Sequence, residues 1–210
     1  MNILNIAFDL DGTLLDSRYR HQKALHDCII RFNPDVKIET LNDYIPFKQN
    51  GNNTPSYLEK KEISPAKDIY DCWLKMIEDE QYLDCDCLFP ESISVLNFLS
   101  RKYNLYLVTG RKNIVAARKQ LKLLELNNYF QEIFIAGSYD NLAEKKYQMT
   151  KHLDLFMIYG DSGIDYEWSR LASTKFVALN CGFRNKIWWL NRGIISYPNL
   201  ELAIKDTLTF

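Results

Sequence analysis

The sequence predicts an α/β protein whose core is a doubly wound, three-layer, Rossmann-like parallel sheet with an inserted α-helical cap. Three observations carry this prediction. Short, nearly continuous apolar runs recur along the chain, as expected of strands that are covered on both faces. Helical patterns lie between most of these runs, which predicts parallel strands joined by crossover helices. One interval is far too long for a single crossover, which predicts an insertion.

Five apolar runs are predicted to form the strands of the core. Their length and continuity fit strands that are buried on both faces of a parallel sheet. Joined by right-handed crossovers, they would form one open sheet. In chain order the predicted strands are Ile3–Phe8, Leu105–Val108, Ile133–Ala136, Leu155–Tyr159 and Phe176–Leu179.

Two core helices follow from the spacing of residues between these runs. One opens at Pro90, since proline is favoured in the first turn of a helix. The other is predicted over Ile114–Leu124. The residues spaced along them are Ile93, Leu96 and Leu99 in the first helix, and Ile114, Val115, Arg118, Leu121 and Leu124 in the second.

The long interval between the first two strands predicts a helical cap over residues 16–89, which leaves residues 1–15 and 90–210 for the α/β core. Helical patterns cover Tyr19–Phe32, Ser56–Lys61 and Ala66–Tyr82, and a polar loop, "PFKQNGNNTPS", lies between them. Acidic residues outnumber basic ones in this interval and no basic stripe is present, so a lid is favoured over a nucleic-acid arm. By position, the loop offers four candidates for substrate selection: Lys48, Asn50, Gly51 and Thr54.

The composition is that of a globular protein, with 47% apolar and 25% charged residues among 210. The net charge of −1 gives no overall attraction to nucleic acid or to an anionic membrane, and no apolar run approaches membrane-spanning length. The first residues lack a secretory signal. Five irregularly spaced cysteines are expected to be reduced thiols. We therefore expect a cytoplasmic protein, monomeric or weakly dimeric, whose partner is a small molecule.

Polar residues follow three of the predicted strands, at the point where each strand ends. Asp9 and Asp11 follow the first strand, "TGR" follows the second, and "GDSGID" follows the fourth. Ligands of open α/β sheets bind beyond the carboxyl ends of the strands, where the strand order reverses. If these strands are neighbours, Asp9, Asp11, Asp161 and Asp165 converge on one crevice.

A cluster of carboxylates repels itself unless a cation is bound there, and hard oxygen ligands without Cys or His favour Mg²⁺. The predicted metal site therefore comprises Asp9, Asp11, Asp161 and Asp165. Thr109 and Gly110 are suited to phosphate oxygens, since a hydroxyl and an amide would lie at a helix start. Arg111 is placed in the same helix turn, where an anion would offset the unfavourable helix dipole, or it is a solvated surface side chain.

A lysine aimed at the crevice would neutralise phosphate and hold a nucleophilic carboxylate. "AEKKYQMTK" offers Lys145 and Lys146, and Lys145 is favoured because Met149 and Leu153 would then follow on the buried side of the helix. Other acid patterns fail as sites. An EF-hand counted from Asp9 would need Gly and Glu where the chain has Leu and Arg. The "DCD" at residues 84–86 has the same acid spacing without Gly-Thr and is interpreted as a solvated loop.

These motifs resemble those of the haloacid-dehalogenase-like superfamily of phosphohydrolases, and the match runs through the whole chain in order. "DLDGT" at Asp9 is similar to the first motif, Thr109 in "VTGR" to the second, a lysine near 145 to the third and "GDSGID" to the fourth. The long insertion resembles the family's helical cap of the first type. Gly182–Leu202 resembles the tail of the phosphoglycolate-phosphatase-like branch. The proline that commonly follows the motif lysine in that branch is missing here, so Lys145 and Lys146 both stay open.

The resemblance implies a Mg²⁺-dependent phosphohydrolase that acts on a small phosphorylated metabolite. Asp9 would attack phosphorus and form an aspartyl-phosphate, while Asp11 would carry protons to the leaving group and from water. Mg²⁺ would be held by Asp9, the Asp11 carbonyl and Asp161, and Asp165 would orient a metal-bound water or Lys145. A phosphomutase that uses the same site is the main alternative. A catalytically inactive phosphate-binding regulator is a third hypothesis, which the intact motif residues disfavour.

Two tryptophans and the three histidines are expected to have structural roles and not to bind a ligand or a metal. Trp188 and Trp189 are expected to pack on the sheet edge rather than stack on a base. His21, His26 and His152 lie in helical patterns without partners at metal-ligand spacing.

Overall fold

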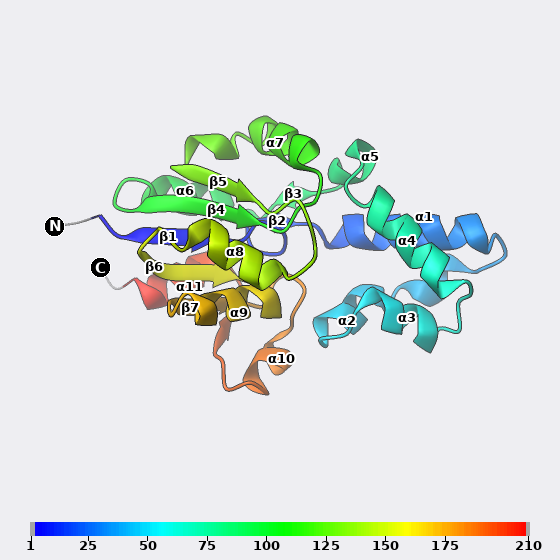
Figure 1. Ribbon diagram of the computed structural model, residues 1–210. Coiled ribbons are helices and arrows are strands. Elements are labelled where there is room, and N and C mark those ends of the chain that lie inside the picture. Colours follow the sequence, from blue (N-terminus) through cyan, green and yellow to red (C-terminus); the bar gives the residue numbers. More distant parts are fainter. Residues whose placement is uncertain (1–2, 209–210) are drawn as a thin grey trace.

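The computed structural model describes residues 3–208. In this part of the chain the main sheet has six parallel strands in the order β5–β4–β1–β6–β7–β8 (Figure 1). The order confirms the predicted doubly wound sheet, and it places β1 between β4 and β6, where the winding reverses. The strands are β1 (Asn5–Phe8), β4 (Asn104–Thr109), β5 (Glu132–Ile135), β6 (Leu155–Gly160), β7 (Lys175–Leu179) and β8 (Ser196–Tyr197).

Helices cover both faces of the sheet and complete the three layers (Figure 1). The helices α6, α7 and α11 pack on one face, and α8 and α9 pack on the other. The short helix α10 follows β7, near β8. Their bounds are α6 (Ser92–Leu99), α7 (Ile114–Leu123), α8 (Leu142–Thr150), α9 (Gly163–Leu171), α10 (Lys186–Leu190) and α11 (Leu200–Thr207).

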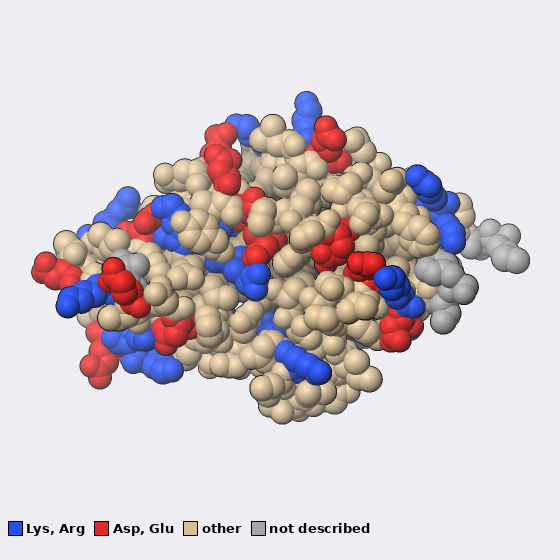
Figure 2. Space-filling model, turned by 180° about the vertical axis from the view of Figure 1, so that it is seen from behind, with Lys and Arg blue, Asp and Glu red and all other residues tan. Residues whose placement is uncertain are grey.

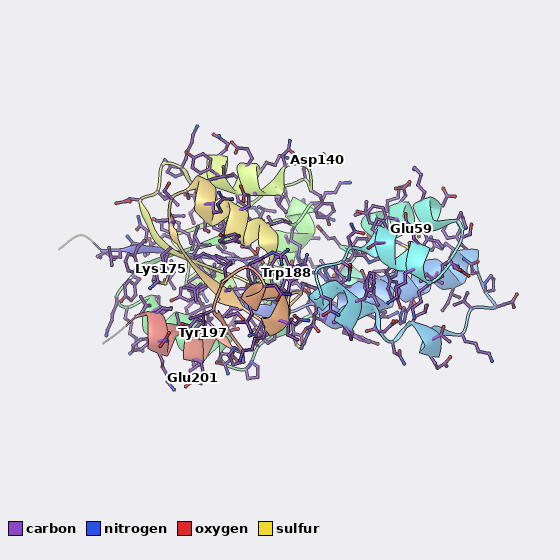
Figure 3. All side chains as sticks on the ribbon, turned by 90° about the horizontal axis from the view of Figure 1, so that it is seen from below. Glu59, Asp140, Lys175, Trp188, Tyr197 and Glu201 are labelled. Atoms are coloured by element: carbon purple, nitrogen blue, oxygen red, sulfur yellow. The ribbon has the colours of Figure 1, made fainter. Side chains whose placement is uncertain are left out.

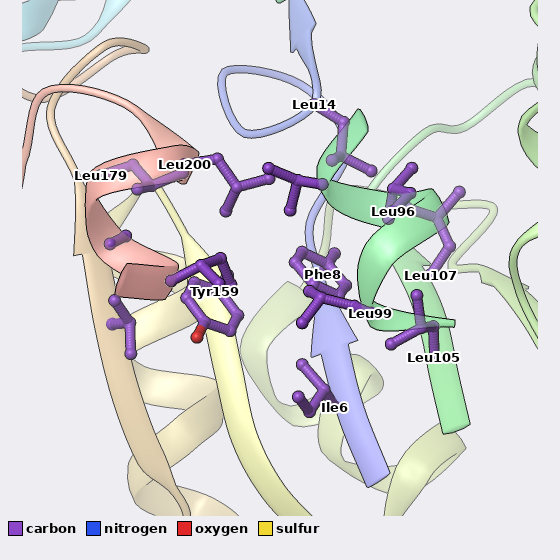
Figure 4. Close-up of a cluster of buried hydrophobic side chains, with 14 of the residues drawn as sticks. Ile6, Phe8, Leu14, Leu96, Leu99, Leu105, Leu107, Tyr159, Leu179 and Leu200 are labelled. Atoms are coloured by element: carbon purple, nitrogen blue, oxygen red, sulfur yellow. The ribbon is translucent and has the colours of Figure 1, made fainter. Parts of the chain in front are cut away.

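The apolar character of β1 follows from burial of both its faces. Ile6 and Phe8 point into the cluster shared with α6, α7 and α11, where the Phe8 ring stacks on Tyr159 with 5.1 Å between centroids (Figure 4). Ala7 points to the opposite face and packs in the cluster that contains Trp168 of α9. Because side chains alternate along a strand, both faces need apolar residues, which produces the continuous run seen in the sequence.

A helical insertion lies between β2 (Leu15–Asp16) and β3 (Cys87–Leu88), two short strands that pair antiparallel. Its helices surround their own buried cluster, centred on contacts between α1 and α4. The insertion projects from the carboxyl end of the main sheet (Figure 1). Its elements are α1 (Arg18–Phe32), a 3₁₀ helix (Ile38–Leu41), α2 (Tyr44–Gln49), α3 (Thr54–Lys60), α4 (Ala66–Met76) and α5 (Glu80–Leu83).

The insertion is bound to the core through the loop that follows β7. The Gln49 side chain donates to the Gly182 carbonyl at 2.8 Å, and the Asn185 amide donates to the Gln49 carbonyl at 2.9 Å. Gly51 has a φ of +99°, and a Cβ there would come within 2.1 Å of the Trp188 indole nitrogen. Trp188 accordingly lies at the junction of α10 with the insertion (Figure 3). It is therefore a contact between insertion and core, whereas Trp189 is fully buried and donates to the Leu179 carbonyl at the sheet.

Three details differ from the sequence prediction. The expected helix over residues 66–82 ends at Met76 and resumes as α5. Ile114 and Val115 are 44% and 79% exposed, so α7 buries Ala117 and Leu121 instead of the whole expected face. The strands β2, β3 and β8 were not expected, because two residues are too short to show a periodic pattern.

Charge is mixed over the visible surface. On the face shown in Figure 2, Lys and Arg side chains are interspersed with Asp and Glu and do not form a continuous basic stripe. Among residues 3–208, no helix combines the length and the apolar character needed to cross a membrane.

Candidate active site

The ends of β1, β4 and β6 bring the predicted site residues into one crevice. Asp9 follows β1 and Asp161 follows β6, while Thr109 is the last residue of β4. Asp165 lies in the first turn of α9, directly after β6. Carboxylate oxygens of Asp9, Asp161 and Asp165 all lie within 4.8 Å of one another, and the three residues are buried. Three of the four expected metal-site carboxylates therefore converge, whereas the Asp11 carboxylate is not in this cluster and is bound by Arg20 and Arg111.

The lysine in the crevice is Lys146, not Lys145. Only 2% of Lys146 is exposed, and its Nζ lies 2.6 Å from both Asp9 Oδ1 and Asp165 Oδ1. The preference for Lys145 assumed that apolar residues mark the buried side of this helix. The fully buried side of α8 instead carries Lys146 and Thr150.

The carboxylates around Lys146 are unequally neutralised. Burial and the Asp165 carboxylate raise the pKa of Asp9 to about 7, although Lys146 acts in the opposite direction. Burial, Asp9 and Asp165 raise the pKa of Asp161 well above its usual range. Burial alone would lower the pKa of Lys146, but Asp165 and Asp9 raise it. Lys146 therefore pairs with only two of the three clustered acids, and burial together with the neighbouring carboxylates favours the neutral forms of Asp9 and Asp161.

The residues present fit a hard divalent cation. Asp161 accepts a 2.5 Å hydrogen bond from the Phe183 amide, which fixes its carboxylate. Gly12, at a φ of +83°, and Gly182 flank that carboxylate so closely that a Cβ on either would come within 2.2 Å of it. A cation near Asp9 and Asp161 would relieve the repulsion that raises both pKa values. Oxygen ligands alone favour Mg²⁺ over softer metals.

Asp11 directs its carboxylate into a second cluster, a ring of four charges that we call the charge ring. Arg20 and Arg111 each bind Asp11, with shortest N···O distances of 2.5 Å. Asp86 completes the ring, 3.1 Å from Arg20 and 3.0 Å from Arg111. Burial alone would raise the pKa of Asp11, but Arg111 and Arg20 hold it far below its ordinary value.

Three sequence expectations are corrected at the charge ring. Arg111 is 3% exposed, so it is not a solvated surface side chain. Gly110 and Arg111 also precede Asn113, the N-cap of α7, so they lie in the loop after β4 and not in the first turn of the helix as expected. The side chain of Asp86 in the "DCD" segment is fully buried, so that segment is not simply a solvated loop. Asp86 could not be identified from local sequence because its partners, Arg20 and Arg111, are distant in the chain.

Thr109 and Gly110 lie at the end of β4, beside the aspartates. Thr109 is 1% exposed and accepts a hydrogen bond from the Arg111 amide at 3.3 Å. A Cβ on Gly110 would come within 2.5 Å of Leu142 at the start of α8, so the helix packs directly on this turn. Both residues line a cavity of about 690 Å³ together with Asp9 and Lys146. The predicted phosphate-binding residues thus share one cavity with the carboxylates.

The other side of the cavity is formed by the helical insertion, and sequence reasoning missed most of its residues. Glu78 accepts hydrogen bonds from the Lys112 and Asn113 amides at distances from 2.6 to 3.0 Å, which ties the end of α4 to the core beside Arg111. The lining residues from the insertion are Arg20, His21, Tyr70, Trp73, Leu74, Ile77 and Glu78.

The segment predicted as a polar loop is mostly helical, since residues 46–49 belong to α2 and residues 54–56 belong to α3. Its side chains mainly make structural contacts. Asn50 pairs with Asn185 at 2.6 Å, and Thr54 is buried beside Tyr44. Of the four expected selection residues, Lys48 lies nearest to the lining, with its Nζ 3.1 Å from His21 Nδ1. The His21 ring contacts Lys48 Nζ and the rings of Trp73 and Phe183.

Comparison with known proteins agrees with this geometry. No curated protein sequence matches the chain significantly. A haloacid dehalogenase-like family hydrolase from Streptococcus pneumoniae is 26% identical, with a TM-score of 0.72, and the match covers 98% of this chain and 99% of that one. A predicted phosphatase from Clostridium acetobutylicum is 19% identical over 100% of both chains, with a TM-score of 0.73.

A third structure is less similar. A HAD-superfamily hydrolase of subfamily IA from Geobacter sulfurreducens is 18% identical, with a TM-score of 0.62, and the match covers 84% of this chain and 87% of that one. Similarity at this level supports the fold. The family itself is shown by sequence, because residues 3–153 match the model of the haloacid dehalogenase-like hydrolases. The expected resemblance is confirmed, and the chain belongs to the haloacid dehalogenase-like hydrolase family.

Proposed function

We propose that this protein is a Mg²⁺-dependent phosphomonoester hydrolase that acts on a small phosphorylated metabolite through an aspartyl-phosphate intermediate. The observation that carries the proposal is the buried contact of Asp9 with Lys146, which faces the cavity beside Thr109 and next to Asp161. A carboxylate held this way is positioned as a nucleophile, with an amide-bearing turn next to it for the phosphate oxygens.

The two oxygens of Asp9 have different tasks in this proposal. Lys146 binds Oδ1, so we assign Oδ2 as the atom that attacks phosphorus. The new Oδ2–P bond forms as the bond from phosphorus to the substrate alcohol oxygen breaks. Lys146 keeps Asp9 oriented and remains protonated, since Asp165 and Asp9 raise its pKa against the effect of burial. Asp165 acts as a positioning residue, because Lys146 and Ser162 already bind its two oxygens.

Asp11 is proposed to move the protons of the reaction. In the first step the protonated Asp11 carboxyl gives its proton to the departing alcohol oxygen. In the second step the resulting carboxylate takes a proton from the water that attacks phosphorus and breaks the Oδ2–P bond, which restores Asp11. The contacts with Arg111 and Arg20 favour the carboxylate form, so they assist the second step and oppose the first. Thr109 and Gly110 would bind the transferring oxygens through a hydroxyl and an amide. When bound by Asp9, Asp161 and the Asp11 carbonyl, Mg²⁺ would supply positive charge against the phosphoryl oxygens.

The helical insertion is proposed to act as a cap that excludes water. Its contacts with the core, through Gln49 at one side and Glu78 at the other, hold the insertion beside the cavity that contains Asp9. Exclusion of water favours transfer of phosphate to the enzyme and strengthens the electrostatic interactions in the site.

The proposal is tested by measuring phosphate release from a panel of sugar phosphates, nucleotides and phosphoglycolate, with Mg²⁺ and with EDTA. We expect turnover with Mg²⁺ that falls to background with EDTA and in Asp9→Asn. The exposed Asp84→Asn is the matched control and should retain full activity. Turnover that survives EDTA or Asp9→Asn would refute the mechanism.

The same assay separates the alternative functions. An isomerised sugar phosphate without free phosphate would support the phosphomutase hypothesis. Binding of phosphate and Mg²⁺ without turnover on any ester would support a regulatory protein.

A further inference from the structure

The end of the cavity formed by the insertion is lined by one apolar face of α4. Tyr70, Trp73, Leu74 and Ile77 all line the cavity. Their spacing of three, four and seven residues from the first places them on one side of the helix. This face, which we call the α4 wall, extends over about 10 Å at the rise of an α-helix.

The aromatic part of the α4 wall is fixed in position. The Tyr70 and Trp73 rings are stacked, with 5.7 Å between their centroids and 22° between their planes. The indole Nε1 of Trp73 donates to the His21 carbonyl at 3.2 Å, so the ring cannot rotate without losing this bond. A rigid aromatic surface binds a planar ring at low entropic cost, because the side chains do not have to be ordered on binding.

The four side chains of the α4 wall are uncharged, and the charged groups near them are already partnered. Glu78, which follows the wall, is bound by the Lys112 and Asn113 amides, and Lys48 Nζ lies 5.5 Å from the centroid of the Trp73 ring. Lys146 is paired with Asp9, and Arg20 and Arg111 are paired within the charge ring. Burial and the adjacent Lys48 lower the pKa of His21 well below its usual value, so its imidazole is neutral.

Three cationic side chains of the lining, Arg20, Arg111 and Lys112, could still attract an anion. Arg20 and Arg111 each retain one buried Nη1 without a hydrogen-bond partner among the described residues, and both lie beside Asp11, where the reacting phosphate and the oxygens next to it would bind. Lys112 also lines the cavity but is exposed, where screening by water weakens its attraction for an anion.

We infer that the substrate is a phosphate monoester whose alcohol carries a planar aromatic or heteroaromatic ring, which stacks against Tyr70 and Trp73. This inference rests on the proposed phosphohydrolase function and names its substrate class. A short anionic alcohol such as glycolate would place a carboxylate against the α4 wall, where an apolar surface offers nothing to replace its hydration.

The test compares substrates that differ in the ring. With Mg²⁺, kcat/KM is measured for adenosine 5′-monophosphate, pyridoxal 5′-phosphate, ribose 5-phosphate and phosphoglycolate. Stacking of a base on aromatic side chains corresponds to about fivefold to 150-fold in binding. We expect at least one of the two aromatic esters to exceed ribose 5-phosphate by about tenfold or more, and phosphoglycolate to be the poorest. If neither aromatic ester exceeds ribose 5-phosphate, the inference is wrong.

Variants of the α4 wall give a second test. Tyr70→Ala should lower kcat/KM for the preferred aromatic ester about tenfold and leave ribose 5-phosphate within about twofold. Leu74→Lys introduces a cation into the wall and should raise kcat/KM for phosphoglycolate relative to kcat/KM for the aromatic ester. Lys75→Ala, on the exposed side of the same helix, is the matched control and should change neither ratio. Equal losses on all substrates in Tyr70→Ala would indicate a purely structural role and overturn the inference.

Failure of the proposed function can be distinguished from failure of this inference. The same four ligands are titrated into Asp9→Asn by calorimetry, which requires no turnover. Tighter binding of an aromatic ester than of ribose 5-phosphate would support the α4 wall even if wild-type protein hydrolyses none of them. Equal affinities would reject it even if hydrolysis is observed.

Discussion

Lys146 and Asp86 are retained as buried charges because each has two partners of opposite sign. Lys146 lies between Asp9 and Asp165, and Asp86 lies between Arg20 and Arg111. Removing one member of such a group leaves an uncompensated charge without water, which is far more costly than removing an exposed ion pair. The loss of stability on substituting a charged residue of the site is therefore expected to increase with the number of buried partners that it has.

A substitution at Lys146 should affect catalysis, whereas the same substitution at Lys145 should not. Lys146→Met removes the cation that orients Asp9, and we expect kcat to fall by about a hundredfold or more. Lys145→Met should stay within about twofold of wild type, since that side chain lies outside the crevice. Steady-state phosphate release measures both, and a large loss in Lys145→Met alone would reverse the assignment.

The stability of the protein should depend on pH through Lys48. Burial and the nearby Arg184 lower its pKa from 10.5 to about 7. Between these values the unfolded chain binds a proton that the folded protein does not, so the unfavourable effect of Lys48 on folding is full below pH 7 and fades as pH rises to 10.5. A cation–π interaction of Lys48 Nζ with the Phe183 ring, whose centroid is 4.6 Å away, offsets part of this effect.

Lys48→Met is the variant that reveals this dependence. We expect it to raise the free energy of unfolding by about 1–3 kcal/mol at pH 7 and to give no gain near pH 10.5. Urea unfolding of both proteins at several pH values measures the difference. Lys75→Met on exposed α4 should show a constant difference, and a gain for Lys48→Met that grows with pH would contradict the sign.

At the scale of elements, the strands β2 and β3 join the helical insertion to the core next to the charge ring. Asp86 immediately precedes β3, and Arg20 lies in the first turn of α1, just after β2. The ring thus connects both linkers of the insertion to Arg111 of the core. Its ion pairs hold the linkers at one fixed position relative to Asp11.

Removing Asp86 should destabilise these linkers strongly. Asp86→Ala leaves Arg20 and Arg111 buried with a single shared carboxylate, and we expect a loss of about 3–5 kcal/mol in the free energy of unfolding. Asp84→Ala, two residues earlier and exposed, should change it by less than about 0.5 kcal/mol. Chemical denaturation gives both values, and similar losses in the two variants would show that the ring contributes little.

The sequence predicted the elements well where the apolar pattern was strong. It predicted them poorly where contacts between distant residues determine which side chains are buried. The runs that became β1, β4 and β6 are apolar because both sheet faces are covered, so their polar ends could be located. Lys146 was ranked below Lys145 because a buried lysine interrupts the apolar pattern that identifies a buried helix face. The α4 wall could not be identified from the sequence, because the apolar residues of a helix face that lines a cavity have the same spacing as those of a face that packs on a protein core.

The whole molecule is closed around the cavity by contacts at two places. The loop after β7 holds both the insertion, through Asn185, and Asp161, through the Phe183 amide. The loop after β7 therefore contributes both to the position of the insertion and to the geometry of the acidic cluster. A ligand that binds the acidic cluster should stabilise the entire closed arrangement rather than a local segment.

Mg²⁺ should raise the thermal stability of the wild-type protein. At a hundred times its dissociation constant, a ligand adds about 2.7 kcal/mol, which corresponds to about 5–10 °C in Tm for a chain of this size. Asp161→Asn should abolish the shift. It should also raise Tm without metal, because burial, Asp9 and Asp165 disfavour the charge of Asp161. Differential scanning fluorimetry with Mg²⁺ or EDTA measures both, and an unchanged shift in Asp161→Asn would exclude Asp161 as a ligand.

The antiparallel pairing of β2 with β3 places the two ends of the insertion side by side. By backbone geometry alone, an unrelated module could be carried there without disturbing the main sheet. The charge ring makes such an exchange chemically costly, because two of its members, Arg20 and Asp86, belong to the insertion while Asp11 and Arg111 belong to the core. Substitutions on the cavity surface of the insertion leave all four charges of the ring in place, whereas replacement of the whole insertion would remove Arg20 and Asp86 and leave Asp11 and Arg111 without them.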